Sequence, residues 1–276
     1  MGLAPRLEIG EARVYVEQEH LKEAFFAIGS GRVSVHSRKN PARATSNEDA
    51  AAVLVTGNDS AVLAVADGLG GARAGQHASA TAVHSLVGAV TEGIRGEQEI
   101  RAAILDGFER ANERVLALGV GAATTLSVAE IDGRSVRPYH VGDSFILVTG
   151  NRGRIKLQTI SHSPVGYGVE SGLLDEHAAM HHEERHVISN VIGSSDMRID
   201  VGIPLKLDPR DTLLLASDGL SDNLHTDEIV ERVRRGALET VTRRLYQSVH
   251  ERMAESDGDS PSKPDDVTFL IFRLAK

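Results

Sequence analysis

The sequence predicts an α+β fold in which two mainly antiparallel sheets pack face to face and a pair of helices covers each outer side. Two observations predict this α-β-β-α four-layer sandwich. Strand-like and helix-like segments occur in separate blocks, in the order strands, two helices, strands, two helices, strand. The runs 62–66 and 212–216 are almost continuously apolar, as expected for strands buried on both faces.

The first part of the chain is dominated by strand-like patterns. Residues 12–35 alternate loosely between apolar and polar side chains, which predicts two or three strands. The polar stretch 37–49 is rich in basic residues, and it suits either a loop that clamps a phosphate or a solvated connection. The runs 50–57 and 61–67 are separated by turn residues and therefore predict a hairpin.

Helices and then strands are predicted in the middle of the chain. Apolar residues at helical spacing predict two helices, over 72–91 and 97–118. Turn residues that include glycine separate the next segments, which predict an antiparallel meander over 122–131, 135–141, 144–149 and 154–159.

The stretch 160–198 interrupts this pattern, and we expect only one short helix in it, at about 173–180. Long irregular stretches are commonly functional, so 160–198 is interpreted as a flap that faces the substrate. The remaining elements are strands at 199–207 and 211–217, helices at about 226–235 and 238–254, a disordered-looking loop at 256–264 and a last strand at 266–274.

Length and composition favour a single domain, 1–276, that includes the flap. With 276 residues, of which 41% are hydrophobic, the chain can bury a large core. The net charge of −9 disfavours nucleic acid and anionic membrane surfaces as partners, since both attract basic faces. The chain has no cysteine, no apolar run of about 18 residues and no signal-peptide pattern at its start, which favours a cytoplasmic protein. The absence of heptads favours a monomer.

Acidic residues stand at four strand ends. Asp67 and Asp218 each close an apolar run and precede a glycine, whereas acidic pairs precede two other strands: Glu48-Asp49 and Asp265-Asp266. A carboxylate at the end of a buried strand is costly unless a cation meets it, and the candidates are Arg73 or a metal ion. Four such ends suggest one site, and oxygen ligands without cysteine favour Mg²⁺, Mn²⁺ or Ca²⁺ over Zn²⁺.

Six motifs occur in an order that resembles the metal-dependent (type 2C) serine/threonine protein phosphatases. They are Asn47-Glu48-Asp49, Val65 to Gly71, Gly121 to Leu126, His140 to Ser144, Ser217 to Asp222, and Asp265 to Thr268. The resemblance covers the chain from about residue 25 to its end. It implies an α-β-β-α sandwich that holds two divalent cations, Mg²⁺ or Mn²⁺, at one edge of the sheets. It also implies hydrolysis of phosphoserine and phosphothreonine by in-line attack of a metal-bridging water.

The resemblance also implies which residues bind the metals. Eight residues match ligand positions of the family: Asp67, Gly68, Asp218, Asp265, Glu48, Asp49, Asp143 and Asp222. Asp67 matches the carboxylate that bridges both metals, the Gly68 carbonyl matches a ligand of one of them, and Asp218 joins Asp67 as a catalytic residue. Asp218 and Asp265 complete the shell of the other metal, while Glu48 and Asp49 act largely through metal-bound water. Asp143 and Asp222 correspond to acids that help to hold a third, weaker metal in bacterial members.

The sequence departs from the family pattern at three positions. The phosphate-binding arginine is expected four residues before the Glu-Asp acid, where Ala44 stands, so Arg43 serves this role only if the loop bulges. Leu69 replaces the histidine that protonates the leaving group in many eukaryotic members. Phe145 replaces an arginine after the Gly-Asp-Ser motif.

Two other functions stay open on the sequence alone. A catalytically silent regulator that binds phosphoproteins would share the fold, but it would be marked by loss of metal acids, and these are present. A phosphatase of small phosphorylated metabolites would share the metal site and differ only at the rim. His177 and His181 are spaced for zinc binding on a helix, but a solvated surface pair is the favoured interpretation because no catalytic acid matches them.

Overall fold

The computed structural model describes residues 4–29, 31–69, 73–119, 121–254 and 262–275. Its strands form two antiparallel sheets. The main strands of the first sheet are, in spatial order, β1 (Ala12–Val16), β4 (Asp49–Gly57), β5 (Ser60–Leu69), β7 (Leu126–Asp132), β8 (Ser135–Val141) and β11 (Asp200–Val201). Two short strands extend it, β6 (Ala123–Thr124) beside β5 and β12 (Leu205–Lys206) beside β8.

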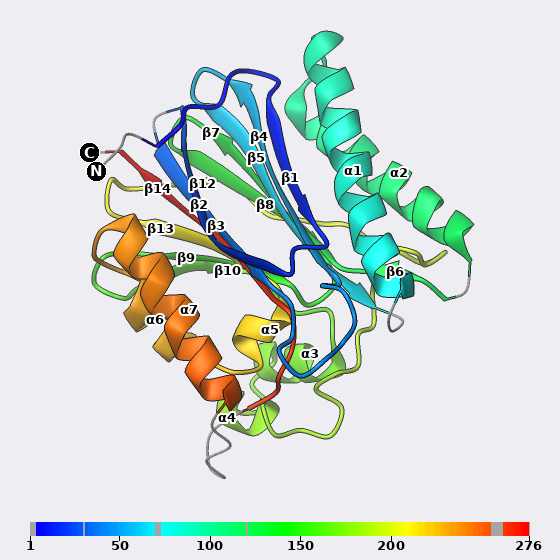
Figure 1. Ribbon diagram of the computed structural model, residues 1–276, viewed down its shortest axis with the longest axis vertical. Coiled ribbons are helices and arrows are strands. Elements are labelled where there is room, and N and C mark those ends of the chain that lie inside the picture. The colour runs from blue at the N-terminus through cyan, green and yellow to red at the C-terminus, as the bar shows by residue number, and fades with distance from the viewer. Residues whose placement is uncertain (1–3, 30, 70–72, 120, 255–261, 276) are drawn as a thin grey trace.

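The second sheet contains β10 (Ile155–Gln158), β9 (Phe145–Thr149), β13 (Thr212–Ala216), β14 (Val267–Leu274), β3 (Gly31–Arg38) and β2 (His20–Ile28), in spatial order. The long helices are α1 (Arg73–Arg95), α2 (Ile100–Leu118), α6 (Thr226–Val233) and α7 (Leu238–Ala254). Figure 1 shows α1 and α2 on one side of the sheets and α6 and α7 on the other. The predicted α-β-β-α sandwich is therefore confirmed.

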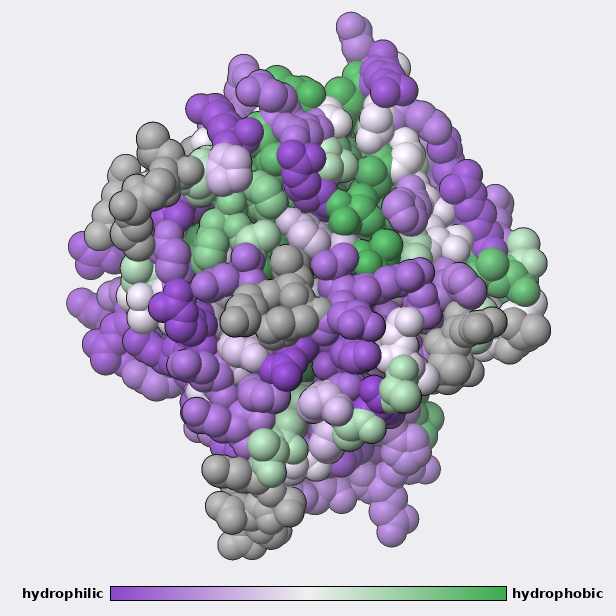
Figure 2. Space-filling model, viewed as in Figure 1, coloured by the Kyte–Doolittle hydropathy of each residue, from purple (hydrophilic) through white to green (hydrophobic). Residues whose placement is uncertain are grey.

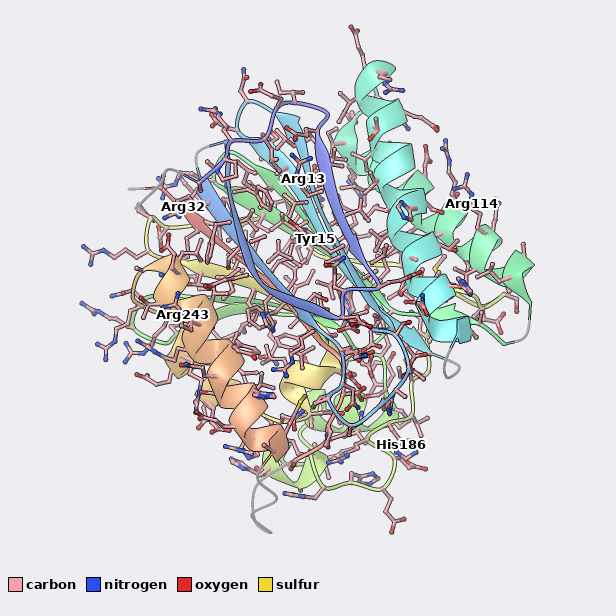
Figure 3. All side chains as sticks on the ribbon, in the orientation of Figure 1. Arg13, Tyr15, Arg32, Arg114, His186 and Arg243 are labelled. Carbon is pink, nitrogen blue, oxygen red and sulfur yellow. The ribbon has the colours of Figure 1, made fainter. Side chains whose placement is uncertain are left out.

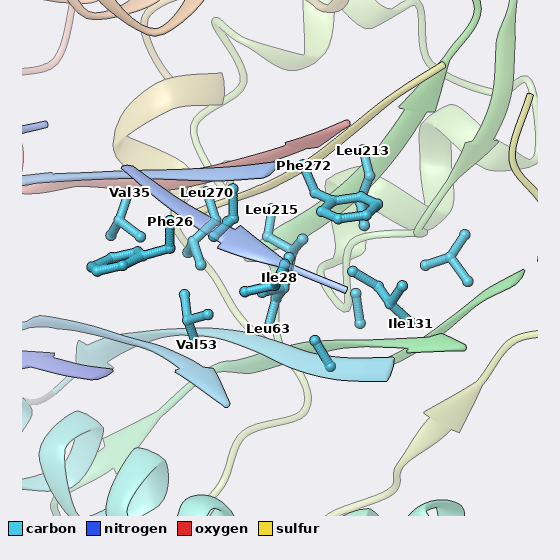
Figure 4. Close-up of a cluster of buried hydrophobic side chains, with 14 of the residues drawn as sticks. Phe26, Ile28, Val35, Val53, Leu63, Ile131, Leu213, Leu215, Leu270 and Phe272 are labelled. Carbon is cyan, nitrogen blue, oxygen red and sulfur yellow. The ribbon is translucent and has the colours of Figure 1, made fainter. Parts of the chain in front are cut away.

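Successive side chains of a central strand point to opposite faces of the sheet, and both faces are buried, which explains why these strands are almost continuously apolar. Val53 and Leu63 point into the core between the two sheets, together with Leu215 from the second sheet (Figure 4). Val65 belongs to the same core. Their neighbours on the same strands face the helices, as Leu54 does toward α1 and α2. Each central strand thus buries both faces, which requires apolar side chains at successive positions.

The outer helices contact the sheets through one apolar stripe each. In α1 this stripe includes Ala78, Ala82 and Leu86, all of them buried. On the other side, ion pairs attach α7 to the second sheet: Arg32 lies 2.5 Å from Glu239, and Arg243 lies 3.1 Å from Glu23. Figure 3 labels the two arginines. Most of the surface in Figure 2 is hydrophilic. A hydrophobic area lies between β1 and the α1–α2 pair.

The four strands predicted as one meander form two separate hairpins, so that prediction was wrong. β7 and β8 pair in the first sheet, whereas β9 and β10 pair in the second. The chain crosses from one sheet to the other at 142–144, where Gly142 has a φ of 105°. A side chain at Gly142 would lie 2.6 Å from the side chain of Thr125, so glycine fits this tight crossing.

Other differences from the predicted elements are local. The flap contains two short helices, α3 (Pro164–Glu170) and α4 (Glu176–Ala179), instead of one over 173–180. The strand expected over 199–207 is reduced to β11 and β12, and a further short helix, α5 (Asp218–Ser221), follows β13. Most of the loop expected at 256–264 lies outside the described residues. No described helix combines the length and apolarity needed to cross a membrane.

Candidate metal centre

Strand pairing brings the acidic strand ends together. Asp49 at the start of β4 is directly opposite Asp67 near the end of β5. In the second sheet, Asp218 follows β13 and Asp265 precedes β14, and these two strands are antiparallel neighbours. The two sheets are in contact at this edge: the Ser217 hydroxyl, at the end of β13, donates a hydrogen bond of 2.8 Å to the Asp49 carboxylate in the first sheet.

Two threonines hold the backbone of Asp67. The Asp67 N–H donates to Thr125 Oγ1 at 2.9 Å, while Thr124 Oγ1 donates to the Asp67 carbonyl at 2.7 Å. Thr125 is in turn hydrogen-bonded to the Ser144 hydroxyl at 2.7 Å. Both threonines are fully buried, so they act as fixed supports for Asp67.

Gly68 lies where the start of α1 approaches β5. A Cβ atom added to Gly68 would lie 2.1 Å from the carbonyl oxygen of Gly75, which leaves room only for glycine. The Gly68 N–H donates to the Glu48 carbonyl at 3.1 Å. Gly75 is equally constrained, since its Cβ would lie 2.6 Å from Glu48 Oε1. These contacts bring Glu48 beside the Asp67-Gly68 turn.

Asp266 links the loop before β4 to the start of β14. Its two carboxylate oxygens accept backbone N–H groups from Asn40, at 2.5 Å, and from Glu48, at 2.7 Å. The side chain of Asn40 then donates to the Pro264 carbonyl at 2.7 Å. In the sequence, Asp266 stands out only as the second residue of the acidic pair before β14, a signal that predicts no role for it.

Asp143 and Asp222 form the outer part of the cluster, next to Asp218. Burial, followed by repulsion from Asp218 and Asp222, raises the pKa of Asp143 to about 8. Burial and repulsion from Asp218 raise the pKa of Asp222 to about 6, although the nearby Lys263 opposes this shift. The structure therefore brings all of the acids singled out in the sequence to one edge of the sandwich.

The raised pKa values of the inner acids show that the repulsion between their carboxylates is not fully neutralised. Burial and the carboxylates of Asp218 and Asp49 raise the pKa of Asp67, and burial with repulsion from Asp266 raises that of Asp49. The pKa of Glu48 is raised to about 7, chiefly by burial. Among the described residues, no hydrogen-bond donor reaches the buried atoms Glu48 Oε1 and Asp143 Oδ1. Crowded hard oxygen atoms without donors fit divalent cations.

Among the described residues, two basic side chains form ion pairs with the cluster. Arg43 Nη1 lies 3.7 Å from Glu48 Oε2 and 3.6 Å from Asp265 Oδ1, so the structure brings Arg43 to the acids despite its shifted position in the sequence. Its side chain is 49% exposed and can meet a ligand. Lys263, which the sequence analysis missed, lies among Asp218, Asp222 and Asp265. The side chain of Arg73, the alternative partner of Asp67, lies outside the described residues.

A cavity of about 340 Å³ adjoins the acidic cluster. The carboxylates of Asp143, Asp218 and Asp222 line one part of it, and the flap helices α3 and α4 line another. The flap thus borders the acids. In the flap, His177 is exposed and contacts the ring of His225, with ring centroids 4.2 Å apart, while His181 is also exposed.

A separate group of His140, His162 and Asp200 joins the flap to the turn that carries Asp143. His162 Nδ1 accepts hydrogen bonds from the Gly142 N–H at 3.1 Å and from the Asn190 side chain at 2.9 Å. Its Nε2 therefore carries the proton and donates to Asp200, at 3.1 Å. Both ring nitrogen atoms of His162 are thus engaged in hydrogen bonds within the protein, so this group serves to hold the flap against the turn that carries Asp143.

Comparison with known proteins identifies the family. The family model described as protein phosphatase 2C matches residues 38–256. Protein phosphatase PhpP of Streptococcus pneumoniae is 33% identical over 193 residues, which cover 67% of this chain and 77% of the relative. The serine/threonine phosphatase stp of Listeria monocytogenes is 29% identical, over 75% of this chain and 81% of the relative.

Solved structures agree with the sequence matches. The serine/threonine phosphatase of S. agalactiae superposes with a TM-score of 0.75 and 27% identity, covering 89% of this chain and all of the other. The catalytic domain of the serine/threonine protein phosphatase PstP, in complex with two manganese ions, has a TM-score of 0.68 at 24% identity and covers 89% and 99% of the two chains. The motif order, the four-layer fold, the gathered acids and these matches agree, and the chain belongs to the protein phosphatase 2C family of metal-dependent serine/threonine phosphatases.

Proposed function

We propose that the acidic cluster binds two divalent cations, Mg²⁺ or Mn²⁺, and that the protein uses them to hydrolyse phosphoserine and phosphothreonine in other proteins. The observation that carries this proposal is the set of crowded carboxylates at one sheet edge, where the buried oxygen atoms Glu48 Oε1 and Asp49 Oδ1 lack donors among the described residues. The related proteins are phosphatases, which supports an enzyme over the silent regulator considered from the sequence.

The proposed ligands come from both sheets. They are Asp67 and the Gly68 carbonyl from β5, Asp218 and Asp265 beside β13 and β14, and Glu48 and Asp49 at the start of β4. Asp67 lies between the other ligands of this set: it is opposite Asp49 in the strand register of β4 and β5, and its carboxylate is close enough to that of Asp218 for the two to repel each other. Bound divalent cations supply charge that activates water and stabilises the phosphate as it is displaced.

The chain itself positions these ligands and the substrate. Thr124 and Thr125 fix the Asp67 backbone, so that its carboxylate is held without reorganisation. Asp266 holds the Glu48 backbone in the same way. The half-exposed Arg43 guanidinium lies beside the acids and is the proposed phosphate-binding residue, because a guanidinium can bind two phosphate oxygens at once.

The flap and the extent of the domain are part of the proposal. Residues 160–198 border the cavity next to Asp218, which supports their role as the surface that contacts the phosphoprotein. We propose that 1–276 acts as one catalytic domain, as a monomer, in the cytoplasm. Analytical ultracentrifugation of the full chain tests the oligomeric state, and a dimer at micromolar concentration would contradict it.

Hydrolysis of a phosphothreonine peptide tests the function. The wild type should turn over the peptide with Mn²⁺ and lose activity in EDTA. Asp218→Asn should reduce kcat by at least about 100-fold, because it removes a charged ligand from the centre. Asp59→Asn is the matched control, since Asp59 is exposed in the turn before β5, at the opposite end of that strand from Asp67, and it should retain full activity.

Circular dichroism shows whether each variant is folded. A folded wild type that binds Mn²⁺ but does not hydrolyse the peptide would contradict the enzyme function. Full activity of Asp218→Asn would contradict the assignment of the ligands.

A further inference from the structure

Lys263 places a positive charge inside the acidic cluster. Its ammonium nitrogen lies 2.5 Å from Asp222 Oδ2, 3.4 Å from Asp218 Oδ2 and 3.4 Å from Asp265 Oδ2. The lysine side chain is only 26% exposed, so these contacts are partly shielded from water. An ammonium in contact with three carboxylates differs from an ordinary surface lysine, which is solvated on most sides.

The backbone of Lys263 is fixed in place. Its N–H donates to Asn223 Oδ1 at 2.8 Å, and Asn223 Nδ2 donates to the Lys263 carbonyl at 2.8 Å. Asn223 is fully buried and directly follows Asp222 in the chain. The next carbonyl, that of Pro264, accepts a hydrogen bond from Asn40. The backbone of Lys263 is therefore anchored beside Asp222 by a buried amide that makes two hydrogen bonds to it.

Each of the three side chains that form an ion pair with Lys263 is a carboxylate, so its positive charge is opposed by negative groups on several sides. A fixed positive charge thus neutralises part of the outer cluster.

We propose that Lys263 is a tethered cation that occupies the outer cation position of the cluster, between Asp218 and Asp222. Asp143, Asp218 and Asp222 would otherwise offer oxygen ligands for a third divalent cation. An ammonium in contact with two of these carboxylates excludes a divalent cation from the same place, because both would need the same oxygen atoms and would repel each other. The protein therefore binds two divalent cations and not three. This inference rests on the ligand assignment proposed above.

A second consequence concerns the protein without metal. The inner acids repel one another, and Lys263 is held against the outer ones by Asn223. Removing the lysine charge leaves Asp218, Asp222 and Asp265 without this partner. The metal-free protein should then lose stability, while saturating Mn²⁺ should restore it, because the added cations supply the missing charge.

The test is the number of Mn²⁺ ions bound by the full chain, measured by isothermal titration calorimetry and by electron paramagnetic resonance of unbound Mn²⁺. The wild type should bind two ions, and Lys263→Met should bind one more. Lys263→Arg keeps the charge and should behave as the wild type. Lys206→Met is the matched control, because Lys206 is exposed on β12, and it should leave the number unchanged.

Thermal unfolding in EDTA gives an independent result. Lys263→Met should melt at a lower temperature than Lys206→Met, and saturating Mn²⁺ should remove most of this difference. Equal Mn²⁺ numbers for Lys263→Met and the wild type would overturn the role of Lys263 and leave the ligand assignment intact.

The number of Mn²⁺ ions bound by the wild type tests the inference even if the methionine variant does not fold. Three Mn²⁺ ions on the wild type would overturn the inference. A wild type that binds no Mn²⁺ would overturn both the inference and the ligand assignment.

Discussion

Replacing Thr125 by valine should destabilise the protein by about 1–3 kcal/mol and weaken Mn²⁺ binding. Valine keeps the shape of threonine but lacks the hydroxyl that accepts the Asp67 N–H at 2.9 Å and bonds to Ser144 at 2.7 Å. Thr125 is fully buried, so water cannot replace it. A buried backbone donor left without a partner costs roughly 1–3 kcal/mol, and the Ser144 hydroxyl can rotate and lose less.

Thr56→Val is the matched control for this substitution. The Thr56 hydroxyl is buried but has no hydrogen-bond partner among the described residues, so its removal breaks no bond. We expect Thr56→Val to be neutral, or to stabilise the protein by up to about 1 kcal/mol, because an unpaired buried hydroxyl is itself costly. The same chemical change should thus act in opposite directions at the two sites.

Urea unfolding in EDTA measures the difference, with circular dichroism as the probe and equal slopes required for comparison. Calorimetric titration with Mn²⁺ then reports whether Asp67 has moved. Equal unfolding midpoints for Thr125→Val and Thr56→Val would refute the reasoning that a hydrogen bond to Thr125 holds the Asp67 backbone.

Three further predictions follow from the site. Gly219→Ala should lower the free energy of unfolding in urea by at least about 2 kcal/mol, because its Cβ would lie 1.9 Å from a backbone carbonyl just before β14. Gly88→Ala is the control: it has open space around it and should stabilise α1 by up to about 1 kcal/mol. Equal effects of the two substitutions would contradict the close packing at Gly219. In EDTA, the melting temperature should fall as the pH rises from about 4.5 to about 7. The folded protein raises the pKa of Glu48 from 4.5 to about 7 and so binds its proton more tightly than the unfolded chain; saturating Mn²⁺ should flatten this dependence, and a rise with pH in EDTA would contradict it. Arg43→Met should raise KM for the phosphopeptide about tenfold, with Arg152→Met as an exposed control, and an unchanged KM would remove Arg43 from phosphate binding.

Much of the architecture could be predicted because its signals are local. The apolar alternation of β4, β5 and β13 and the helical spacing of α1 and α7 depend on neighbouring residues. The wrong meander shows the limit of such signals. A turn at 142–144 has the same composition whether the next strand pairs with the previous one or crosses to another sheet. The crossing is seen only in the strand pairing, where β9 lies beside β13 and β10 in the second sheet.

The site shows the same division. The acids at strand ends could be recognised, since a carboxylate beside a buried strand demands a cation. The roles of Asp266 and Lys263 could not, because an acid next to an acid, or a lysine in a polar loop, has many ordinary explanations. Arg43 was placed in doubt by its offset in the sequence, yet the fold of the loop brings it within 3.6–3.7 Å of two acids.

Local signals in the sequence were enough to predict the main strands and helices and the side chains that can bind a cation, because hydrophobic burial and ligand chemistry are properties of each residue and its close neighbours. How these parts combine depends on contacts between distant segments. The Ser217–Asp49 bond joins residues 168 positions apart, and Asp266 reaches the Glu48 backbone across 218 positions. Such contacts exist only after the two sheets have packed together, and they place Asp67, Asp218 and Lys263 in one cluster.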